Sequence, residues 1–253
     1  TAPLDADIAN LKAAMADNPD REAFMNAASP GILATFIPNA HYDSEDLYVE
    51  ALAAAMQTEY ERIVDAGFVL QLDCPDIGMG RHTYYQNETE DGYLRKIARN
   101  VDALNAATAN IAPDRMRLHI CWGNYPAPHT HDIPVTKIFH ELRRVRPQAL
   151  VFEASNPRHE HEWEDWTAAA LPDDKILIPG VIDSTSNYVE HPRLIAQRIG
   201  RFADAVGCER VIAGTDCGFG TFAGTGHVYA SVVWAKFAAL TEGAAIATDK
   251  LRG

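Results

Sequence analysis

The chain has 253 residues, of which 47% are hydrophobic and 23% charged, and this composition excludes a mostly disordered protein. Its net charge of −13 argues against binding to the phosphate backbone of nucleic acids or to an anionic membrane surface. The length fits one large domain. Because no apolar run reaches the roughly 18 residues of a spanning helix, we expect no membrane segment.

Six apolar runs rich in β-branched residues predict buried strands. In chain order these runs are residues 31–38, 68–73, 116–121, 149–153, 176–181 and 210–214. They carry too few polar residues to be half exposed, which is typical of parallel strands that are covered on both faces.

Amphipathic patterns between these runs predict helices. They cover residues 45–66, 91–111, 191–206 and 227–251, while residues 1–24 read as a helix and a connection. The strands follow one another at intervals of roughly 27 to 48 residues, and each interval has room for one crossover helix. The sequence therefore predicts repeated βα units in a single domain over residues 1–253.

Two architectures accommodate six such units. A doubly wound open sheet would be complete with six strands, whereas an eight-stranded (β/α) barrel of the TIM type would lack two. No GxGxxG or Walker-type loop follows a predicted strand, and this absence disfavours a nucleotide-binding open sheet.

Four side chains with metal-binding chemistry lie at the ends of predicted strands. His119 and Cys121 are two residues apart and therefore face the same way, Glu153 ends the next strand, and Cys217 follows the last one. An imidazole, two thiolates and a carboxylate can together bind zinc. The alternative is that the cysteines are small core residues and Glu153 is a structural carboxylate.

These motifs resemble the C-terminal catalytic barrel of cobalamin-independent methionine synthase, over residues 31–220. The His-x-Cys pair, the strand-ending Glu153 and the Asp-Cys-Gly after the last strand occur in the order of that family. Further similarities are Gln71-Leu72-Asp73 with Pro75, Glu153-Ala154-Ser155 and Gly180-Val181-Ile182-Asp183. The resemblance implies an (β/α)8 barrel of the uroporphyrinogen decarboxylase superfamily. It also implies zinc bound by His119, Cys121, Glu153 and Cys217.

The barrel family has two more strands before residue 31. The resemblance therefore predicts that this chain is an N-terminally shortened part of a longer protein.

The sequence departs from methionine synthase at two positions. Thr185 stands where the family has a histidine thought to move protons at the folate, and Cys74 replaces a glutamate. Because a hydroxyl does not replace an imidazole as a proton shuttle near pH 7, these changes favour a second branch, epoxyalkane:coenzyme M transferase. That branch adds a zinc-bound thiol to an epoxide. Methyl transfer from methyltetrahydrofolate to homocysteine is the alternative.

Further candidates follow from the same resemblance and from their positions at strand ends. We expect Tyr125, His129 and the neighbouring His131 to supply a proton, and Asp183 to act in catalysis. Substrate-binding candidates are Asp73, Arg81, Trp122 and Asn124. Asp216 is expected to be structural, and residues 159–166 to open a helix with a solvated face rather than to bind metal.

The sequence thus predicts a zinc-dependent thiol alkyltransferase whose partners are a small thiol and an alkyl donor. A noncatalytic zinc protein is a further alternative, although structural zinc sites usually have closely spaced ligands, unlike these. The four cysteines (Cys74, Cys121, Cys208 and Cys217) are too few for a disulfide scaffold and predict a reduced, cytoplasmic setting. A homo-oligomer is compatible with the sequence.

Overall fold

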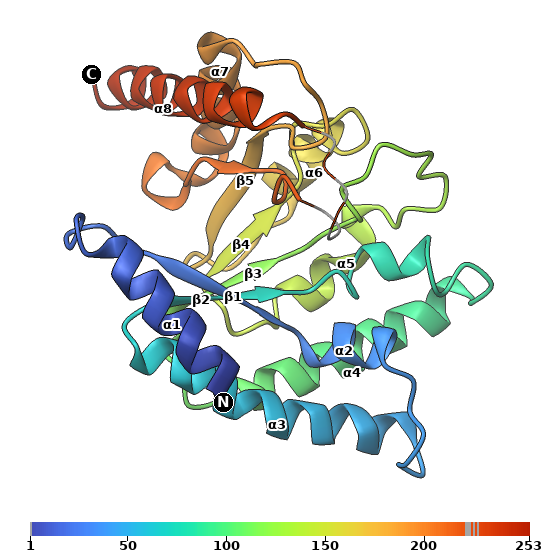
Figure 1. Cartoon of the computed structure of the whole chain (residues 1–253). Helices are drawn as coiled ribbons and strands as arrows, with labels where there is room; N and C mark the ends of the chain where they lie inside the picture. Colours follow the sequence, from blue (N-terminus) through green and yellow to red (C-terminus); the bar gives the residue numbers. More distant parts are fainter. Residues whose placement is uncertain (1, 221–223, 225, 227) are drawn as a thin grey trace.

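The computed structural model describes residues 2–220, 224, 226 and 228–253, and these residues form a six-stranded parallel sheet (Figure 1). The strands are β1 (Phe24–Ala28), β2 (Val69–Asp73), β3 (Met116–His119), β4 (Ala149–Phe152), β5 (Ile176–Ile182) and β6 (Gly214–Thr215). Each strand pairs with the next one along the chain, so that the spatial order is also β1 to β6. The carboxyl ends of all six strands therefore meet at one edge, where barrel enzymes place their chemistry.

Helices connect the strands on the outer side of the sheet. They are α1 (Ala2–Met15), α2 (Pro30–Phe36), α3 (Glu45–Asp65), α4 (Glu90–Ala107), α5 (Val135–Leu142), α6 (Trp163–Ala168), α7 (Pro192–Val206) and α8 (Ala230–Arg252). Short 3-10 segments are η1 (Met79–Arg81), η2 (Pro113–Arg115), η3 (Glu160–Glu162) and η4 (Cys208–Arg210). In Figure 1, α3 and α4 lie below the first strands and α7 and α8 lie beyond β5. The sheet curls into a partial TIM-type barrel, which confirms the predicted fold class.

The predicted first strand, residues 31–38, is wrong. This segment forms α2, because Ser29 caps the helix by accepting a hydrogen bond from the Ile32 backbone N–H at 3.0 Å. Pro30 then occupies the first turn, where its fixed φ favours a helix. The first strand is instead β1 (Phe24–Ala28), which ends just before Ser29. It begins at the last residue of the segment 1–24, which was predicted as a helix and a connection.

The other predicted strands from 68 to 181 are confirmed to within two residues. The predicted strand 210–214 is mostly wrong, since β6 is only Gly214–Thr215 and Val211 forms one isolated bridge to Leu177. Helices α3, α4 and α7 begin within one residue of their predicted starts. Helix α8 begins at Ala230, and residue 227, the predicted start, lies outside the described residues.

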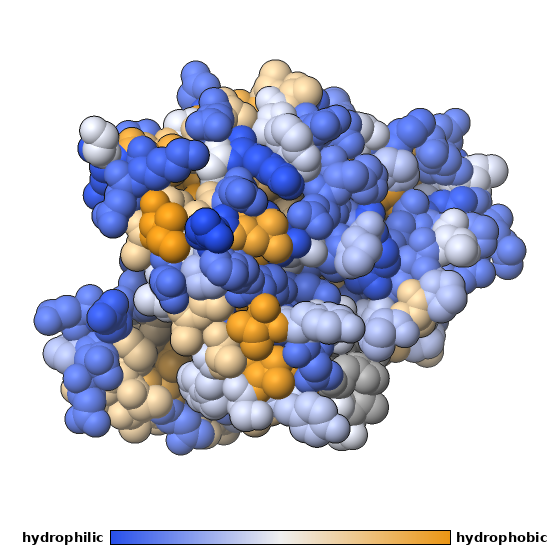
Figure 2. Space-filling model, turned by 90° about the horizontal axis from the view of Figure 1, so that it is seen from above, coloured by the Kyte–Doolittle hydropathy of each residue, from blue (hydrophilic) through white to orange (hydrophobic). Residues whose placement is uncertain are grey.

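The two largest of three apolar clusters form most of the core. The larger one lies between β1–β4 and helices α3 to α6, and it includes Tyr60, Tyr93 and Phe152, all fully buried. The smaller cluster joins β5 to α7 and α8 through Ile182 and Ile195. Seen from above, the surface is mostly hydrophilic, with apolar side chains gathered in separate patches (Figure 2).

Helix α8 is the last element of the chain that the structure describes, and it packs against α7. Gly243 allows this close approach, because a Cβ at that position would lie 2.6 Å from Ile195 side-chain atoms. By length and composition alone α8 is apolar enough to cross a membrane. One such helix is weak evidence for a membrane span, because helices that pack in a protein core can meet the same criteria. Lys236 on its inner face is buried and bonds Glu190 at 2.8 Å.

Candidate metal centre

Three of the predicted metal ligands converge at the carboxyl edge of the sheet. His119 ends β3, Cys121 follows two residues later, and Cys217 lies in the loop after β6. The two sulfur atoms are 3.5 Å apart, and Cys217 Sγ lies 3.3 Å from His119 Nε2. All three ligand atoms lie within 4.8 Å of one another. The fold thus brings together residues that are 96 positions apart in the chain.

The orientation of His119 is set by Asp73. Their Nδ1 and Oδ1 atoms are 2.7 Å apart, which leaves Nε2 facing the two cysteines. Burial by itself would lower the pKa of His119, but the hydrogen bond to Asp73 and the nearby Cys121 raise it to about 9. Carboxylates that hold histidine ligands in this way fix the tautomer and increase ligand basicity.

The fourth predicted ligand, Glu153, lies beside this group. Its Oε1 accepts a hydrogen bond from the Trp122 backbone N–H at 2.8 Å and lies 3.9 Å from Cys217 Sγ. Its Oε2 accepts hydrogen bonds from Asn156 at 2.7 Å and Arg158 at 3.2 Å. Both carboxylate oxygens are therefore held by the protein, and Glu153 is a buried carboxylate group next to the cysteines.

Asp216 fastens the loop of Cys217 to the loop after β4. It accepts hydrogen bonds from the backbone N–H groups of Ala154 and Ser155 and from Asn156, each at 2.9 Å. Burial and the charge of Glu153 raise its pKa to about 7. These contacts agree with the structural role expected for Asp216. Asn156 was not among the predicted site residues, although it lies only three residues after the strand-ending Glu153.

Asp183 and Asn124 organise the backbone around the cysteines. Asp183 accepts hydrogen bonds from the backbone N–H and the hydroxyl of Thr185, at 2.8 and 2.7 Å. Ser184, which lies between Asp183 and Thr185 in the chain, donates a hydrogen bond to Asn124 Oδ1 and accepts one from the Cys217 backbone N–H, both at 3.1 Å. Ser184, another residue that the sequence analysis missed, thus links the β5, β3 and β6 loops.

An open cavity of about 570 Å³ lies in front of the three ligands. Its lining includes Asp73, His119, Cys121, Asn124 and Cys217 among the predicted residues. Polar side chains of Asn26, Gln71 and Arg117 and apolar ones of Phe24 and Ile178 also contribute to its walls. The predicted ligands therefore face a space that is large enough for a small substrate.

Two predicted substrate-binding residues do not line this cavity. Trp122 is fully buried, and its indole N–H donates to the Ile133 carbonyl at 2.9 Å, as a core residue would. Arg81 donates to the Tyr85 carbonyl at 2.8 Å and so supports its own loop.

The predicted proton donors Tyr125 and His129 belong to a different group of side chains. The Tyr125 hydroxyl lies 2.8 Å from His82 Nε2, and His129 Nδ1 lies 3.1 Å from Asp132 Oδ2. Neither Tyr125 nor His129 lines the cavity at the cysteines. His159 also faces Asp132, so the expectation of a solvated face over residues 159–166 is wrong at this residue, which is 3% exposed.

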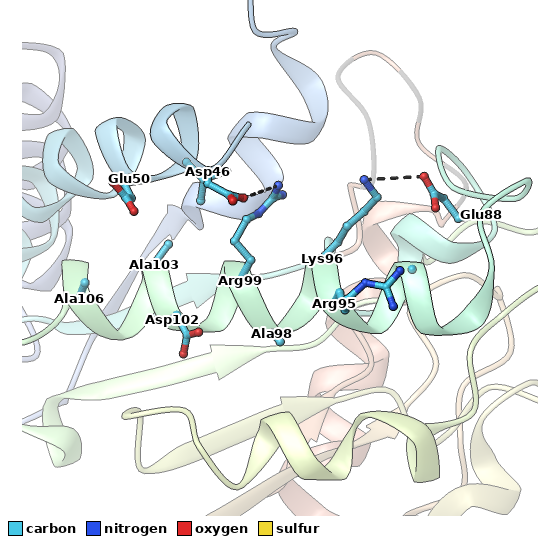
Figure 3. Close-up of a pocket in the computed structure, with 12 residues that line it drawn as sticks. Asp46, Glu50, Glu88, Arg95, Lys96, Ala98, Arg99, Asp102, Ala103 and Ala106 are labelled. Carbon is cyan, nitrogen blue, oxygen red and sulfur yellow. Dashed lines mark ion pairs between the residues drawn. The ribbon is translucent and has the colours of Figure 1, made fainter. Parts of the chain in front are cut away.

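A second groove, of about 940 Å³, runs along the outer helices α3 and α4 (Figure 3). Two ion pairs lie along it: Arg99 in α4 is 3.6 Å from Asp46 in α3, and Lys96 is 3.8 Å from Glu88, which lies just before α4. None of the predicted site residues lines it. The convergent chemistry therefore lies at the sheet edge and not in the larger groove.

Known proteins resemble this chain in family and in fold. No curated protein matches the sequence. A solved B12-independent methionine synthase from a Shewanella species, in complex with selenomethionine, has a similar fold with a TM-score of 0.67 and 17% identity. The match covers 92% of this chain and 64% of that one, so the chain spans less than two thirds of its solved relative. The family described as "Cobalamin-independent synthase, Catalytic domain" matches residues 30–239, and the chain belongs to this family.

Proposed function

We propose that this chain is a zinc-dependent transferase that activates a small thiol for S-methylation. The observation that carries the proposal is the convergence of His119, Cys121 and Cys217 on one cavity. Membership of the cobalamin-independent synthase family supports the reaction type, and the solved relative is a methionine synthase. A homocysteine-like thiol is therefore the proposed acceptor.

The donor set fits zinc by chemistry and by spacing. Zinc bonds of about 2.3 Å to sulfur and 2.0–2.1 Å to nitrogen place tetrahedral ligands roughly 3.4–3.8 Å apart. The observed separations, 3.5 Å between the sulfurs and 3.3 Å from Cys217 Sγ to His119 Nε2, are close to these values. Three protein ligands leave one position for another group, as catalytic zinc sites do. Bound zinc would keep the sulfur of a substrate thiol deprotonated and nucleophilic at neutral pH.

The remaining residues have supporting roles in this proposal. Asp73 holds the His119 ring and also lines the cavity, where its 43% exposed side chain can attract an ammonium group of the thiol substrate. Glu153, 3.9 Å from Cys217 Sγ, is the proposed fourth ligand that yields to the incoming sulfur. Its bonds to Trp122 and Arg158 keep the carboxylate in place when it is released.

A second candidate is thiol addition to an epoxide, in the manner of epoxyalkane:coenzyme M transferase. Thr185 favours it, because this residue replaces the histidine that the resemblance assigns to proton transfer at folate. Its weakness is the alkoxide product, which needs a proton. The predicted donors Tyr125 and His129 do not line the cavity, so methyl transfer is the better-supported reaction.

The experiment is turnover of a thiol panel by the zinc-loaded chain. Homocysteine, coenzyme M and glutathione are each offered with methyltetrahydrofolate and with small epoxides. We expect the chain to consume one of these thiols. The activity should be lost in Cys217→Ala and kept in Cys208→Ala, since Cys208 lies in η4 away from the cavity.

The same preparation separates the alternatives. Absence of any thiol consumption by zinc-loaded protein would contradict the proposal. X-ray absorption with and without thiol tests the role of Glu153, because sulfur should replace an oxygen neighbour of the metal. Bound zinc whose neighbours do not change would support a noncatalytic zinc protein. We place the reaction in the cytoplasm, where thiol groups stay reduced.

A further inference from the structure

Three histidines surround one aspartate beside the loop that follows β3. His82 follows η1, His129 and Asp132 lie in the loop between β3 and α5, and His159 precedes η3. The side chains are almost fully enclosed, with 5% exposure for His82, 0% for His129, 3% for His159 and 13% for Asp132. We call these four residues the histidine cluster. Three imidazoles and a carboxylate enclosed in this way form a donor set in their own right.

The spacing of the donor atoms suits a single ion. Asp132 Oδ1 lies 2.6 Å from His82 Nδ1, and Asp132 Oδ2 lies 3.1 Å from His129 Nδ1 and 3.3 Å from His159 Nε2. The ligand atoms of His82, His129 and Asp132 all lie within 4.8 Å of one another, and His159 lies outside this group of three and reaches it through Asp132. Ligands about 2.0–2.1 Å from a tetrahedral ion lie roughly 3.3–3.4 Å apart, so small rearrangements admit an ion.

In the described part of the chain, each of the three rings has one nitrogen without a hydrogen-bond partner. Among the described residues, His82 Nδ1, His129 Nε2 and His159 Nε2 are buried and have no hydrogen-bond partner. The first and third lie near Asp132 but without hydrogen-bond geometry. Buried polar atoms without partners cost free energy, and an ion beside Asp132 would satisfy His82 Nδ1 and His159 Nε2, whereas His129 faces Asp132 through Nδ1.

The outer nitrogens of two rings have the partners that metal-binding histidines usually have. His159 Nδ1 lies 3.0 Å from Glu162 Oε2, and His82 Nε2 lies 2.8 Å from the Tyr125 hydroxyl. Donation of these outer N–H groups leaves His159 Nε2 and His82 Nδ1 as lone-pair donors facing Asp132. Asp132 and Glu162 would balance the charge of a divalent ion. The nearby Arg158 points elsewhere, toward the Tyr125 carbonyl and Glu153.

We propose that the histidine cluster is a second metal site, which binds a divalent transition-metal ion of the zinc type separately from the thiolate centre. Imidazole nitrogens suit zinc and its neighbours, so His82, His129 and Asp132 would hold the ion. A shift of His159 toward them would complete the four ligands of a structural site. The ion would join the loop of His129 and Asp132 to the segments that carry His82 and His159. The proposal does not depend on the methyltransfer function.

The competing state without metal is a charged hydrogen-bond network. Burial by itself would lower the pKa of His159, but Asp132 and Glu162 raise it to about 9, so a metal-free cluster would hold an imidazolium between two carboxylates. In that state the cluster would bind no zinc, and zinc content therefore separates the two states.

The test uses the Cys121→Ser/Cys217→Ser double variant, which lacks the thiolate ligands of the first centre. After incubation with Zn²⁺ and gel filtration, this background should retain about one zinc per chain, as expected for a four-ligand site. Adding Asp132→Asn or His82→Gln should lower the zinc content by about tenfold or more, whereas His131→Ala, an exposed histidine of the same loop, should not. Two separate ligand variants are used in case one of them fails to fold.

Co²⁺ supplies a second readout. The cobalt-loaded double variant should show the visible bands of nitrogen and oxygen ligation without a sulfur-to-metal charge-transfer band. A background that binds neither ion, or one that keeps its zinc after either ligand substitution, overturns the proposal. Because the background lacks both thiolates, neither result depends on whether the chain methylates thiols.

Discussion

Asp73 and His119 are direct partners in the parallel pairing of β2 with β3, and their side chains are joined at 2.7 Å between Oδ1 and Nδ1. The register of the sheet therefore fixes the orientation of a metal-facing ring. Since both residues end their strands, a one-residue slip would turn the carboxylate to the opposite face and away from the imidazole.

Removal of this carboxylate tests the relationship. We expect Asp73→Ala to weaken zinc binding at the thiolate centre by about 10- to 100-fold, because the His119 ring loses its orienting partner. Competition with a chelator, in a background with Asp132→Asn to remove the histidine cluster, measures the change. Asp46→Ala, on the outer groove, is the control. Equal affinities for the two variants would contradict the role of Asp73.

Gly180 in β5 leaves room for Asp216. A Cβ at this position would lie 2.1 Å from Asp216 Oδ1 and 2.5 Å from its backbone atoms. We expect Gly180→Ala to lower the free energy of unfolding by about 1–3 kcal/mol through overpacking, and to weaken metal binding by displacing the neighbouring Cys217. Urea unfolding and zinc titration measure the two effects.

Gly200 offers a matched control for that substitution. It lies inside α7, and a Cβ there would meet no atom within 4 Å. Gly200→Ala should therefore raise the stability by about 1 kcal/mol, because alanine favours the helix, and should leave metal binding unchanged. Loss of stability in both variants would indicate that the contact with Asp216 is not the cause.

Lys236 and Glu190 form a buried ion pair that joins α8 to the loop after β5. Lys236 Nζ lies 3.0 and 2.8 Å from the two Glu190 oxygens, and the side chains are 0% and 9% exposed. Lys236→Met should cost about 3–5 kcal/mol in urea unfolding, since it leaves a buried carboxylate unpaired. The double variant with Glu190→Gln should recover part of this loss. A double variant less stable than Lys236→Met would argue against an unpaired charge as the cause.

The stability should also depend on pH through Asp76. This carboxylate accepts hydrogen bonds from Ser29 at 2.7 Å and Asn100 at 2.9 Å, yet burial raises its pKa above the ordinary value. An acid whose folded pKa is raised holds its proton more tightly when folded. The resulting stability is complete below the unfolded pKa of about 3.9 and is lost as the pH rises through the folded pKa.

Asp76→Asn removes this dependence because the amide stays neutral. We expect the free energy of unfolding of the variant, relative to that of the wild-type chain, to increase as the pH rises from the unfolded to the folded pKa of Asp76. Urea unfolding at several pH values measures this difference. Asp46→Asn, an exposed substitution, should follow the wild-type curve. Parallel curves for wild type and Asp76→Asn would show that Asp76 ionises as easily in the folded chain as in the unfolded one.

Local patterns in the sequence determined the class of fold and part of the site. Apolar β-branched runs separated by helical patterns predicted the parallel βα units, and the His-x-Cys spacing predicted that His119 and Cys121 face the same way. The error at residues 31–38 also had a local signal, since Ser29 and Pro30 form a helix start that outweighs an apolar run.

Only the tertiary structure decided which residues share a site. The distance between Cys121 and Cys217 depends on the curl of the sheet from β3 to β6, and no local pattern encodes it. The histidine cluster escaped prediction for the same reason, because His82 and His159 come from separate loops and meet Asp132 only in the folded chain. Backbone propensities act over a few residues, whereas contacts between strand-end loops are set by register and packing across the whole sheet.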